Sequence, residues 1–447
     1  MKKVITYGTY DLLHQGHINL LRRAKELGDY LIVGVTSDSF DRGRGKLNVR
    51  NNVLERVEAV KATGYADKII IEDYVGQKID DIQKYNVDIF AIGSDWEGLF
   101  DYLNEYTKVV YLPRTEGISS TMLRAESTTD VKVGILGCGR VANRFPAEAD
   151  VVNGIAITAC FDTDAYSMND YTRTYKDVKA CASYESMLDE VDAVYVATPH
   201  LEHYACIKTA LNAGKHVLCE TPMVLQGAQA KELFELAEQK GVILMEANKT
   251  AHCPAFNHLM VMIKSGVIGE VVDIEASLSQ LLDKNGREFD ATQAGGALYE
   301  QGSYPLLPII RLMGCDYKNL NIYSRMENGV DIHTKGVFRY DHAVCSFKVG
   351  LGVKTEGNLV ISGTKGYAYV PAPWWLTDYF ELRYEDQNKN QKFFYKWDGA
   401  GLRYEIQEFI SCIVNKRFST ARLRRRESVC MAEVMEAFGN RKNFMEI

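Results

Sequence analysis

The feature that most constrains the fold is an alternation of short apolar runs with helical segments, and this alternation begins twice. Tyr30–Val35 is a continuous apolar run, as expected of a strand buried on both faces of a sheet. Val131–Leu136 starts a second series after the polar break Glu126–Asp130. Beyond about residue 265 the runs lengthen and alternate, as in Val271–Gln280 and Val337–Val349, which favours an antiparallel sheet. The pattern predicts an α/β protein with two parallel sheets followed by an open antiparallel sheet.

Composition limits the classes of function. Of 447 residues, 46% are hydrophobic and 25% are charged, the balance of a globular protein, and we expect domains at 1–127, 130–250 and 251–447. The net charge of −7, with no basic half, argues against nucleic-acid binding. No apolar run could cross a bilayer and no secretory signal is present, so we expect a cytoplasmic chain without membrane contact. The ten cysteines stand singly, which predicts neither disulfides nor a structural metal site.

A first candidate site lies where the opening strand Val4–Tyr7 becomes a helix. His14 and His17 are three residues apart, so both can share one face of the first helical turn. Gly16 leaves room for a phosphate close to the N–H groups and the positive dipole end of the helix. The alternative is that the two histidines only cap the helix.

A second phosphate-binding element follows the strand Val109–Leu112. Arg114 supplies a guanidinium, and Ser119, Ser120 and Thr121 supply hydroxyls at a helix start, which together suit phosphate binding. Taken alone, this segment could be no more than a capped helix. The two elements at strand ends of one α/β domain predict a polyphosphate site.

These residues also carry a resemblance. With Gly8–Asp11, the His-x-Gly-His at His14–His17, Asp95–Gly98 and the Arg-Thr-x-Gly-Ile-Ser at Arg114–Ser119, the segment Lys2–Arg124 resembles the glycerol-3-phosphate cytidylyltransferases of the HxGH nucleotidyltransferase superfamily. The resemblance implies transfer of CMP from CTP to glycerol 3-phosphate or a related polyol phosphate, with release of diphosphate. It also implies Mg²⁺, because the leaving group is diphosphate.

The resemblance implies a role for individual residues, since in-line attack needs mainly positioning and charge stabilisation. The catalytic residues would be His14, His17, Lys46 and Arg114. The CTP contacts would be Thr9, Tyr10, His14, His17, Asp95, Arg114, Ser119, Ser120 and Thr121. Asp11 would orient the loop or a metal-bound water, while Arg56 and Trp96 would line the acceptor site, although Trp96 could equally belong to the core. The glycine-rich Asp41–Gly45 departs from the family, which leaves the acceptor open.

The second series of strands opens with a glycine-rich loop. Gly137, Gly139 and Ala142 follow a strand and open a helix, and Asp162 ends the next strand. This is the dinucleotide-binding fingerprint, in which the glycines admit the pyrophosphate and the acid binds the ribose hydroxyls. The carboxylate favours NAD over NADP, since it would repel a 2′-phosphate.

Three further motifs, at Ala197–His203, Gly214–Pro222 and Gly295–Tyr304, resemble those of the Gfo/Idh/MocA oxidoreductases over about residues 130–447. The resemblance implies hydride transfer between NAD or NADP and a carbon of a sugar or polyol, here a sugar phosphate. It also implies a C-terminal α/β domain whose open antiparallel sheet forms the interface of a homo-oligomer, a dimer or tetramer. The cofactor contacts would be Gly137, Gly139, Arg140, Val141, Asp162, Thr198, Pro199 and Glu220.

One departure from this family affects catalysis. The family's Glu-Lys-Pro motif reads Glu220-Thr221-Pro222, and threonine cannot replace an ammonium group as acid or base. Tyr304 could act instead if a neighbouring cation such as Lys249 lowers its pKa; the alternative is that Tyr304 only packs and Lys249 is solvated. The remaining substrate contacts would be His200, which with His203 we expect to form hydrogen bonds and not to bind metal, and Glu300.

The sequence therefore predicts a bifunctional enzyme in which the oxidoreductase half makes a polyol phosphate from a sugar phosphate and the transferase half converts it to a CDP-polyol. CDP-polyols are building blocks of teichoic-acid-like or capsular polymers. The alternative keeps the cytidylyltransferase but makes the second half a catalytically inactive module that binds a dinucleotide or sugar phosphate. Thr221 is the feature that favours this alternative.

Overall fold

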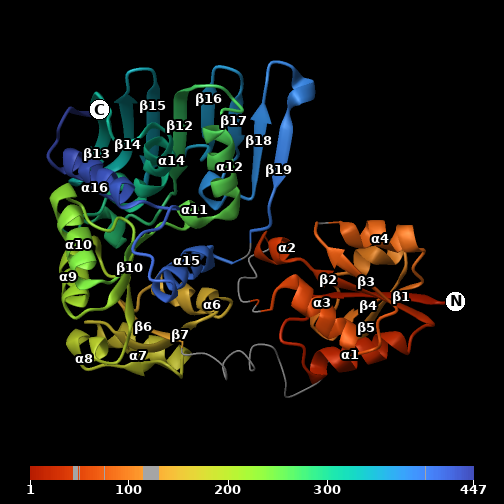
Figure 1. The fold of residues 1–447 in the computed structure, drawn as a ribbon. Helices are drawn as coiled ribbons and strands as arrows, with labels where there is room; N and C mark the ends of the chain where they lie inside the picture. The colour runs from red at the N-terminus through yellow and green to blue at the C-terminus, as the bar shows by residue number, and fades with distance from the viewer. Residues whose placement is uncertain (44–48, 50, 75, 114–129, 398) are drawn as a thin grey trace. The chain divides into compact units, whose positions relative to one another are not determined.

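The computed structural model describes residues 1–447 except 44–48, 50, 75, 114–129 and 398. The chain divides into two compact units, Met1–Thr129 and Asp130–Ile447 (Figure 1). The first unit contains one sheet and the second contains two.

The first unit is built on a parallel sheet with the order β3-β2-β1-β4-β5. Its strands are β1 (Lys3–Gly8), β2 (Tyr30–Thr36), β3 (Lys68–Glu72), β4 (Ile89–Gly93) and β5 (Lys108–Leu112). In the register of the central strand, Val4 lies opposite Leu31 on one side and Ile89 on the other. Because all strands are parallel, their carboxyl ends meet at one edge, where α/β proteins place their ligand sites.

Helices cover both faces of this sheet. On one face α1 (Gln15–Lys25) and α3 (Val53–Ala62) bury Leu21 and Val60 against the strands. On the other face α4 (Gln77–Tyr85) and the 3₁₀ helix η2 (Asp101–Glu105) contribute Ile82 and Leu103. The short α2 spans Asp38–Gly43. Helix α3 begins with a capping box, in which Asn52 and Glu55 each accept a hydrogen bond from the other's backbone N–H, at 3.0 and 2.8 Å.

The second unit begins with a six-stranded parallel Rossmann sheet in the order β11-β10-β9-β6-β7-β8. Its strands are β6 (Val131–Leu136), β7 (Ile155–Phe161), β8 (Lys179–Ala180), β9 (Ala193–Val196), β10 (His216–Glu220) and β11 (Leu244–Ala247). One face packs against α6 (Phe145–Ala149), α7 (Ala165–Thr174) and α15 (Leu402–Val414). The other face packs against α8 (Tyr184–Leu188), α9 (His203–Asn212) and α10 (Gly227–Lys240). Helix α15 lies within the range 251–447 that the sequence predicts as the third domain, but it packs against the Rossmann sheet.

A nine-stranded sheet in the order β19-β18-β17-β16-β12-β15-β14-β13-β20 completes the unit. Its strands are β12 (Val271–Ser279), β13 (Asn319–Glu327), β14 (Val330–Arg339), β15 (Val344–Gly350), β16 (Leu359–Gly363), β17 (Tyr367–Val370), β18 (Tyr379–Arg383), β19 (Gln391–Phe394) and β20 (Phe444–Glu446). Neighbouring strands are antiparallel except the pairs β12–β15 and β13–β20. The run at 337–349 is a hairpin, because β14 ends and β15 begins within it.

Helices pack against this sheet and join it to the Rossmann part. They are α11 (Lys249–His252), α12 (Pro254–Lys264), α13 (Ala297–Gln301), α14 (Ser303–Met313) and α16 (Arg425–Gly439). Their apolar side chains, such as Phe256 and Met435, share one core with the inner face of the sheet. The predicted fold class is confirmed: two parallel α/β sheets are followed by a mixed sheet that is mostly antiparallel.

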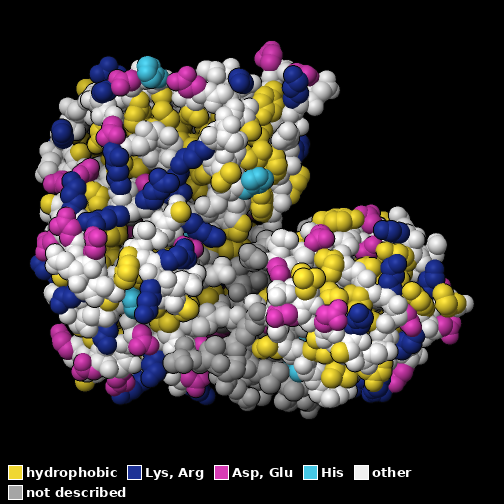
Figure 2. All heavy atoms as spheres, viewed as in Figure 1, with side chains coloured by type: hydrophobic (Ala, Val, Ile, Leu, Met, Phe, Trp, Pro, Cys, Tyr) yellow, Lys and Arg dark blue, Asp and Glu magenta, His cyan; other side chains and the backbone are white. Residues whose placement is uncertain are grey.

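The surface carries charges of both signs. On the face drawn in Figure 2, Lys and Arg side chains are interspersed with Asp and Glu over each unit. All ten cysteines are thiols, and most are buried. In the part of the chain that the structure describes, no helix is both long enough and apolar enough to cross a membrane.

Candidate active sites

In the first unit, the loop between β1 and α1 has a strained backbone beneath the two histidines. Tyr10 and Leu12 have φ angles of 54° and 47°, in the left-handed region that such residues rarely adopt. Tyr10 is buried, and its ring meets that of His17 edge to face with centroids 5.5 Å apart. Burial raises the pKa of Tyr10, so the phenol stays protonated at neutral pH. Strain of this kind persists where neighbouring contacts fix a loop, often at binding sites.

The histidines lie together at the start of α1, as the sequence predicts. His14 is the N-cap residue, and its Nδ1 accepts a hydrogen bond from the N–H of Gly16 at 3.1 Å. Because Nδ1 is the acceptor, the neutral ring carries its proton on Nε2. The His17 ring stacks on that of His14 with centroids 3.9 Å apart. The pair therefore stands where the N–H groups and dipole of an eleven-residue helix favour an anion.

Arg56 lies under this loop and joins three segments of the chain. It is fully buried and donates to the carbonyl oxygens of Thr9 at 2.7 Å, Thr36 at 2.8 Å and Asn51 at 2.9 Å. A fourth hydrogen bond, of 2.5 Å, reaches the carboxylate of Asp38. This geometry does not favour the expected contact with the acceptor phosphate, because the guanidinium is enclosed and donates to protein groups. Arg56 instead fixes the Thr9 backbone.

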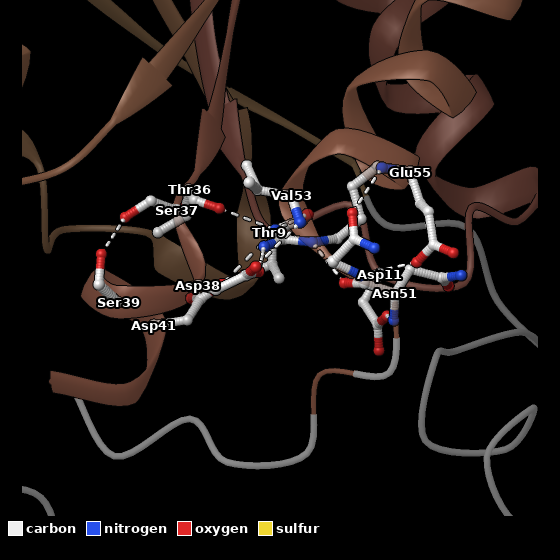
Figure 3. A network of polar contacts seen from close by, with 12 residues as sticks. Thr9, Asp11, Thr36, Ser37, Asp38, Ser39, Asp41, Asn51, Val53 and Glu55 are labelled. Atoms are coloured by element: carbon white, nitrogen blue, oxygen red, sulfur yellow. Dashed lines mark hydrogen bonds and ion pairs between the residues drawn. The ribbon is translucent and has the colours of Figure 1, made fainter.

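The side chains of Thr9 and Asp11 are also engaged (Figure 3). The Thr9 hydroxyl donates to Asp41 at 3.2 Å, and Asp11 accepts from the backbone N–H of Asn51 at 3.0 Å. Both residues are buried. Their hydrogen bonds hold the loop against α2 and the start of α3, which agrees with an orienting role for Asp11.

The remaining transferase residues fall into two groups. Asp95 and Trp96 lie in the 3₁₀ helix η1 (Ser94–Trp96) after β4, and both are exposed. Trp96 is 51% exposed, so its alternative assignment to the core is wrong. The predicted site residues that lie outside the described residues are Lys46, Arg114, Ser119, Ser120 and Thr121.

A metal ion is not held by a ready-made cluster in the described residues. No three His, Cys, Asp or Glu side chains gather there in a group that could ligate one. Mg²⁺ that arrives on a triphosphate usually keeps several waters and takes only one or two carboxylates. The expected Mg²⁺ therefore stays a prediction.

The second unit contains a pocket of about 720 Å³ at the carboxyl edge of the Rossmann sheet. Every residue predicted for this half lines it. These residues are Gly137, Gly139, Arg140, Val141, Asp162, Thr198, Pro199, His200, Glu220, Lys249, Glu300 and Tyr304. Ligands of open parallel sheets bind at this edge, so the pocket is the candidate site for a dinucleotide and substrate.

The glycine loop fits a dinucleotide. Gly137 has a φ of 89°, and a Cβ there would lie 2.7 Å from the carbonyl oxygen of Ala197, so this position requires glycine. A Cβ on Gly139 would meet no atom within 4 Å, which leaves this side of the loop open to the pocket. Asp162 accepts hydrogen bonds from the N–H groups of Cys138 at 2.7 Å and Asp164 at 2.8 Å. Each of its oxygens keeps a lone pair for a ribose hydroxyl.

Tyr304 does not have the lowered pKa that the sequence analysis considered. Burial raises its pKa, and the charges of Glu220 and Glu405 raise it further. The expectation that Lys249 lowers it is wrong, because burial and the two carboxylates act in the opposite direction. Tyr304 is thus a protonated hydrogen-bond donor at neutral pH. Glu220 itself accepts a hydrogen bond from the Tyr195 hydroxyl, and burial raises its pKa.

Three polar residues form part of the pocket wall: His200 is buried, while Arg287 and Glu300 are partly buried. Arg287 lies 3.0 Å from the Glu300 carboxylate, and His200 Nδ1 lies 3.7 Å from it. Burial lowers the pKa of His200 to about 3 and raises that of Glu300 to about 7. Among the described residues, His200 Nδ1 and Arg287 Nη1 have no hydrogen-bond partner. Buried polar atoms are normally paired, so this wall suits a ligand with several hydroxyl groups.

His203 is occupied by the protein. Its Nδ1 lies 2.9 Å from the carbonyl oxygen of Pro222, and its Nε2 lies 2.8 Å from that of Thr198. The ring therefore joins the loop after β9 to the loop after β10. This agrees with the expectation that His203 forms hydrogen bonds.

Lys249 lies at the start of α11 and is part of the pocket wall. It is neither fully exposed nor fully buried, so the alternative of a freely solvated lysine is wrong. Burial lowers its pKa, while the carboxylates of Glu405 and Glu220 raise it in part. Four further residues that line the pocket were not predicted from the sequence: Arg144, Arg287, Glu288 and Glu405. No spacing marks these residues, because they come from distant segments.

The two units thus define a nucleotidyltransferase-type α/β unit joined to a dinucleotide-binding oxidoreductase. Residues 5–126 match the cytidylyltransferase-like family, and residues 131–248 match the oxidoreductase family with an NAD-binding Rossmann fold. Residues 256–369 match the Gfo/Idh/MocA C-terminal domain. The chain belongs to both families: it is a cytidylyltransferase fused to a Gfo/Idh/MocA oxidoreductase.

Known proteins resemble each half separately. The glycerol-3-phosphate cytidylyltransferase of Staphylococcus aureus is 51% identical over 126 residues, which are 28% of this chain and 95% of that protein. The trans-1,2-dihydrobenzene-1,2-diol dehydrogenase of Oryctolagus cuniculus is 29% identical over 291 residues, 63% of this chain and 88% of that protein. KijD10, a 3-ketoreductase from Actinomadura kijaniata solved with NADP and TDP-benzene, has a TM-score of 0.64 at 23% identity, covering 71% of this chain and 99% of its own. That structure supports the fold of the second half.

Proposed function

We propose that the first half transfers CMP from CTP to a polyol phosphate, glycerol 3-phosphate or a related compound, with release of diphosphate. The observation that carries this proposal is the 51% identity to a glycerol-3-phosphate cytidylyltransferase over 95% of its length. The stacked pair His14–His17 at the start of α1 supports it, because the developing charge on the α-phosphate would meet N–H donors and a helix dipole. Mg²⁺ would accompany the triphosphate.

For the second half we propose an NAD(P)-dependent reduction that makes this polyol phosphate from a sugar phosphate. The glycine loop and Asp162 would hold the dinucleotide, whose nicotinamide supplies the hydride. His200 Nδ1 and Arg287 Nη1, which have no hydrogen-bond partner among the described residues, support a substrate rich in hydroxyl groups. The CDP-polyol product would be consumed in the synthesis of a teichoic-acid-like or capsular polymer.

The proposed organisation has domains at 1–127, 130–250 and 251–447, and a homo-oligomer formed through the open sheet of the last. A second candidate function makes the oxidoreductase half a binding module without turnover, and Thr221 favours it because the family lysine is missing there. Nicotinamide binding without turnover on a broad panel of sugar phosphates would identify that module.

Diphosphate release tests the first half. The full chain is assayed with CTP, Mg²⁺ and each of glycerol 3-phosphate, ribitol 5-phosphate and other polyol phosphates. We expect release with one acceptor, loss of at least about a hundredfold in His17→Ala, and full activity in His342→Ala, a matched exposed histidine in the second unit. The same panel of sugar phosphates with NADH then tests the second half. If no acceptor releases diphosphate, and none does when sugar phosphates and NADH are added together, the proposal is overturned.

A further inference from the structure

Thr221, which stands where the family has a lysine, lies at the same edge of the Rossmann sheet as another lysine, Lys249. Strands β10 and β11 are parallel neighbours, and Glu220 pairs with Ala247 in their register. Thr221 follows the first of these residues, and Lys249 comes two residues after the second. Both positions therefore leave the sheet at the same edge, from adjacent strands, and both side chains line the 720 Å³ pocket.

The surroundings of Lys249 set it apart from a surface lysine. Three carboxylates lie near enough to raise its pKa, those of Glu405 on α15, Glu220 at the end of β10 and Glu148 on α6. One cation, Arg144 in the 3₁₀ helix η3 (Ala142–Arg144), lowers it. Glu405 is buried, and its Oε2 has no hydrogen-bond partner among the described residues. Burial and Arg144 lower the pKa of Lys249 and the carboxylates raise it, with a net decrease.

We propose that Lys249 carries out the proton transfer of the oxidoreductase half, in place of the lysine that Thr221 has replaced. In the reducing direction, the Nζ ammonium of Lys249 gives one proton to the carbonyl oxygen of the substrate while the hydride from NADH reaches the carbonyl carbon. The products are the alcohol, NAD⁺ and a neutral amine, which regains its proton from water. The inference rests on the proposed function, and it requires an oxidoreductase that turns over.

Tyr304 has a different role in this arrangement. Its pKa is raised, so it remains protonated and can donate a hydrogen bond that orients the carbonyl. An ammonium group with a lowered pKa gives up a proton more readily than an ordinary lysine, whose pKa is about 10.4. Lys249 is therefore better suited than Tyr304 to exchange a proton in each cycle.

Four variants of the full chain test the proposal with the sugar phosphate found above. We expect Lys249→Met to lower kcat by about a hundredfold or more and to leave NADH binding, followed by its fluorescence, unchanged. Lys249→Arg should be equally slow, because a guanidinium does not release its proton. The double variant Thr221→Lys/Lys249→Met should recover activity, since it returns a lysine to the neighbouring strand end. Lys240→Met, at the exposed end of α10, is the matched control and should behave as the wild type.

If Lys249 only supplied positive charge to the neighbouring carboxylates, Lys249→Arg would keep its activity, because arginine carries the same charge. If Lys249→Arg keeps wild-type kcat and an unchanged pH profile, Lys249 is structural and the proposal is overturned. Full activity of Lys249→Met would overturn it equally.

A second measurement needs no substrate and so separates this inference from the proposed function. The chain is labelled with trace acetic anhydride from neutral to alkaline pH, and the acetylation of each lysine is read by peptide mass spectrometry, with Lys240 as the standard for labelling efficiency. We expect the midpoint for Lys249 to lie below about 10.4, and bound NADH to protect it. A midpoint at or above that value, or no protection, contradicts the proposal even if reduction of a sugar phosphate is observed.

Discussion

Replacing Arg56 by lysine should destabilise the transferase unit and not simply weaken binding of the acceptor. The guanidinium is fully buried and makes four hydrogen bonds, three to carbonyl oxygens and one to Asp38. A lysine keeps the charge, but its single nitrogen cannot reach partners that surround a planar fork. The substitution would leave about two of the four contacts unmade.

The size of the effect follows from those two contacts. A hydrogen bond to a charged group contributes about 1.5–3 kcal/mol, so the loss of two is about 3–6 kcal/mol. A loss of about 3 kcal/mol corresponds to roughly a hundredfold increase in the population of the open state, and the amides of β1 and β2 should exchange faster by that factor. The assay is amide hydrogen exchange of the full chain, read by mass spectrometry.

Two controls make the result specific. Peptides of β9 in the second unit should exchange as in the wild type. Arg22→Lys should change nothing, because Arg22 is exposed and forms a surface ion pair with Glu26 one helical turn away, at 2.7 Å. If Arg56→Lys leaves the exchange of β1 and β2 unchanged and only raises the KM for the acceptor, the positioning role of Arg56 is refuted. The sequence-based interpretation, in which Arg56 contacts the acceptor phosphate, would then be correct.

Three further changes test the second unit. Gly137→Ala and Gly139→Ala should both weaken NADH binding by fluorescence, but only the first should lower the melting temperature, since only there would the Cβ strike the backbone; normal NADH binding by Gly139→Ala contradicts the assignment. Asp331 is buried with a pKa raised from 3.8 to about 7, so its protonated form is favoured by folding and that stability is lost as pH rises through this window. In the wild type, the free energy of unfolding measured in urea should fall by about 4 kcal/mol as the pH rises through this window, and Asp331→Asn should remove that fall. If the two proteins show the same dependence of unfolding free energy on pH, Asp331 is not its cause. Glu148 accepts hydrogen bonds from Nε and Nη2 of Arg403, each at 3.0 Å, so Glu148→Gln should lower the free energy of unfolding by about 3 kcal/mol or more and speed amide exchange in α15. Unchanged exchange in α15 would show that this ion pair does not stabilise the helix.

The elements that the sequence predicted well are those with strong local patterns. The run Tyr30–Val35 became β2 and the run Val131–Leu136 became β6, because strands buried on both faces leave a continuous apolar pattern. The run at 337–349 was taken as one segment, since alternation continues through the turn that divides it. The place of α15 in the Rossmann core had no local signal, because it depends on contacts with strands far away in the chain.

The candidate sites show the same division. The glycine loop with Asp162 was predictable because its spacing encodes a strand, a tight turn and a helix. The protonation state of Tyr304 was not predictable, since burial raises its pKa most, followed by the charges of Glu220 and of Glu405, which lies on a helix about a hundred residues further along. The hydrogen bonds of Arg56 were not predictable for a related reason: its partners are mostly backbone carbonyls of three segments, and a carbonyl acceptor leaves no trace in a sequence.

The pocket also bears on whether the oxidoreductase half turns over. A module that only held a dinucleotide would need the glycine loop and Asp162, but it would gain nothing from Glu405, a buried carboxyl group whose Oε2 has no hydrogen-bond partner among the described residues. Such a group is costly unless a partner or a function offsets the cost. Glu405 lines the same pocket as Lys249 and Tyr304, where a reacting carbonyl oxygen would need a proton. Threonine at position 221 therefore does not by itself indicate that catalysis is lost. It is explained equally by a proton donor that has moved from the end of β10 to the segment after β11, where Lys249 lies.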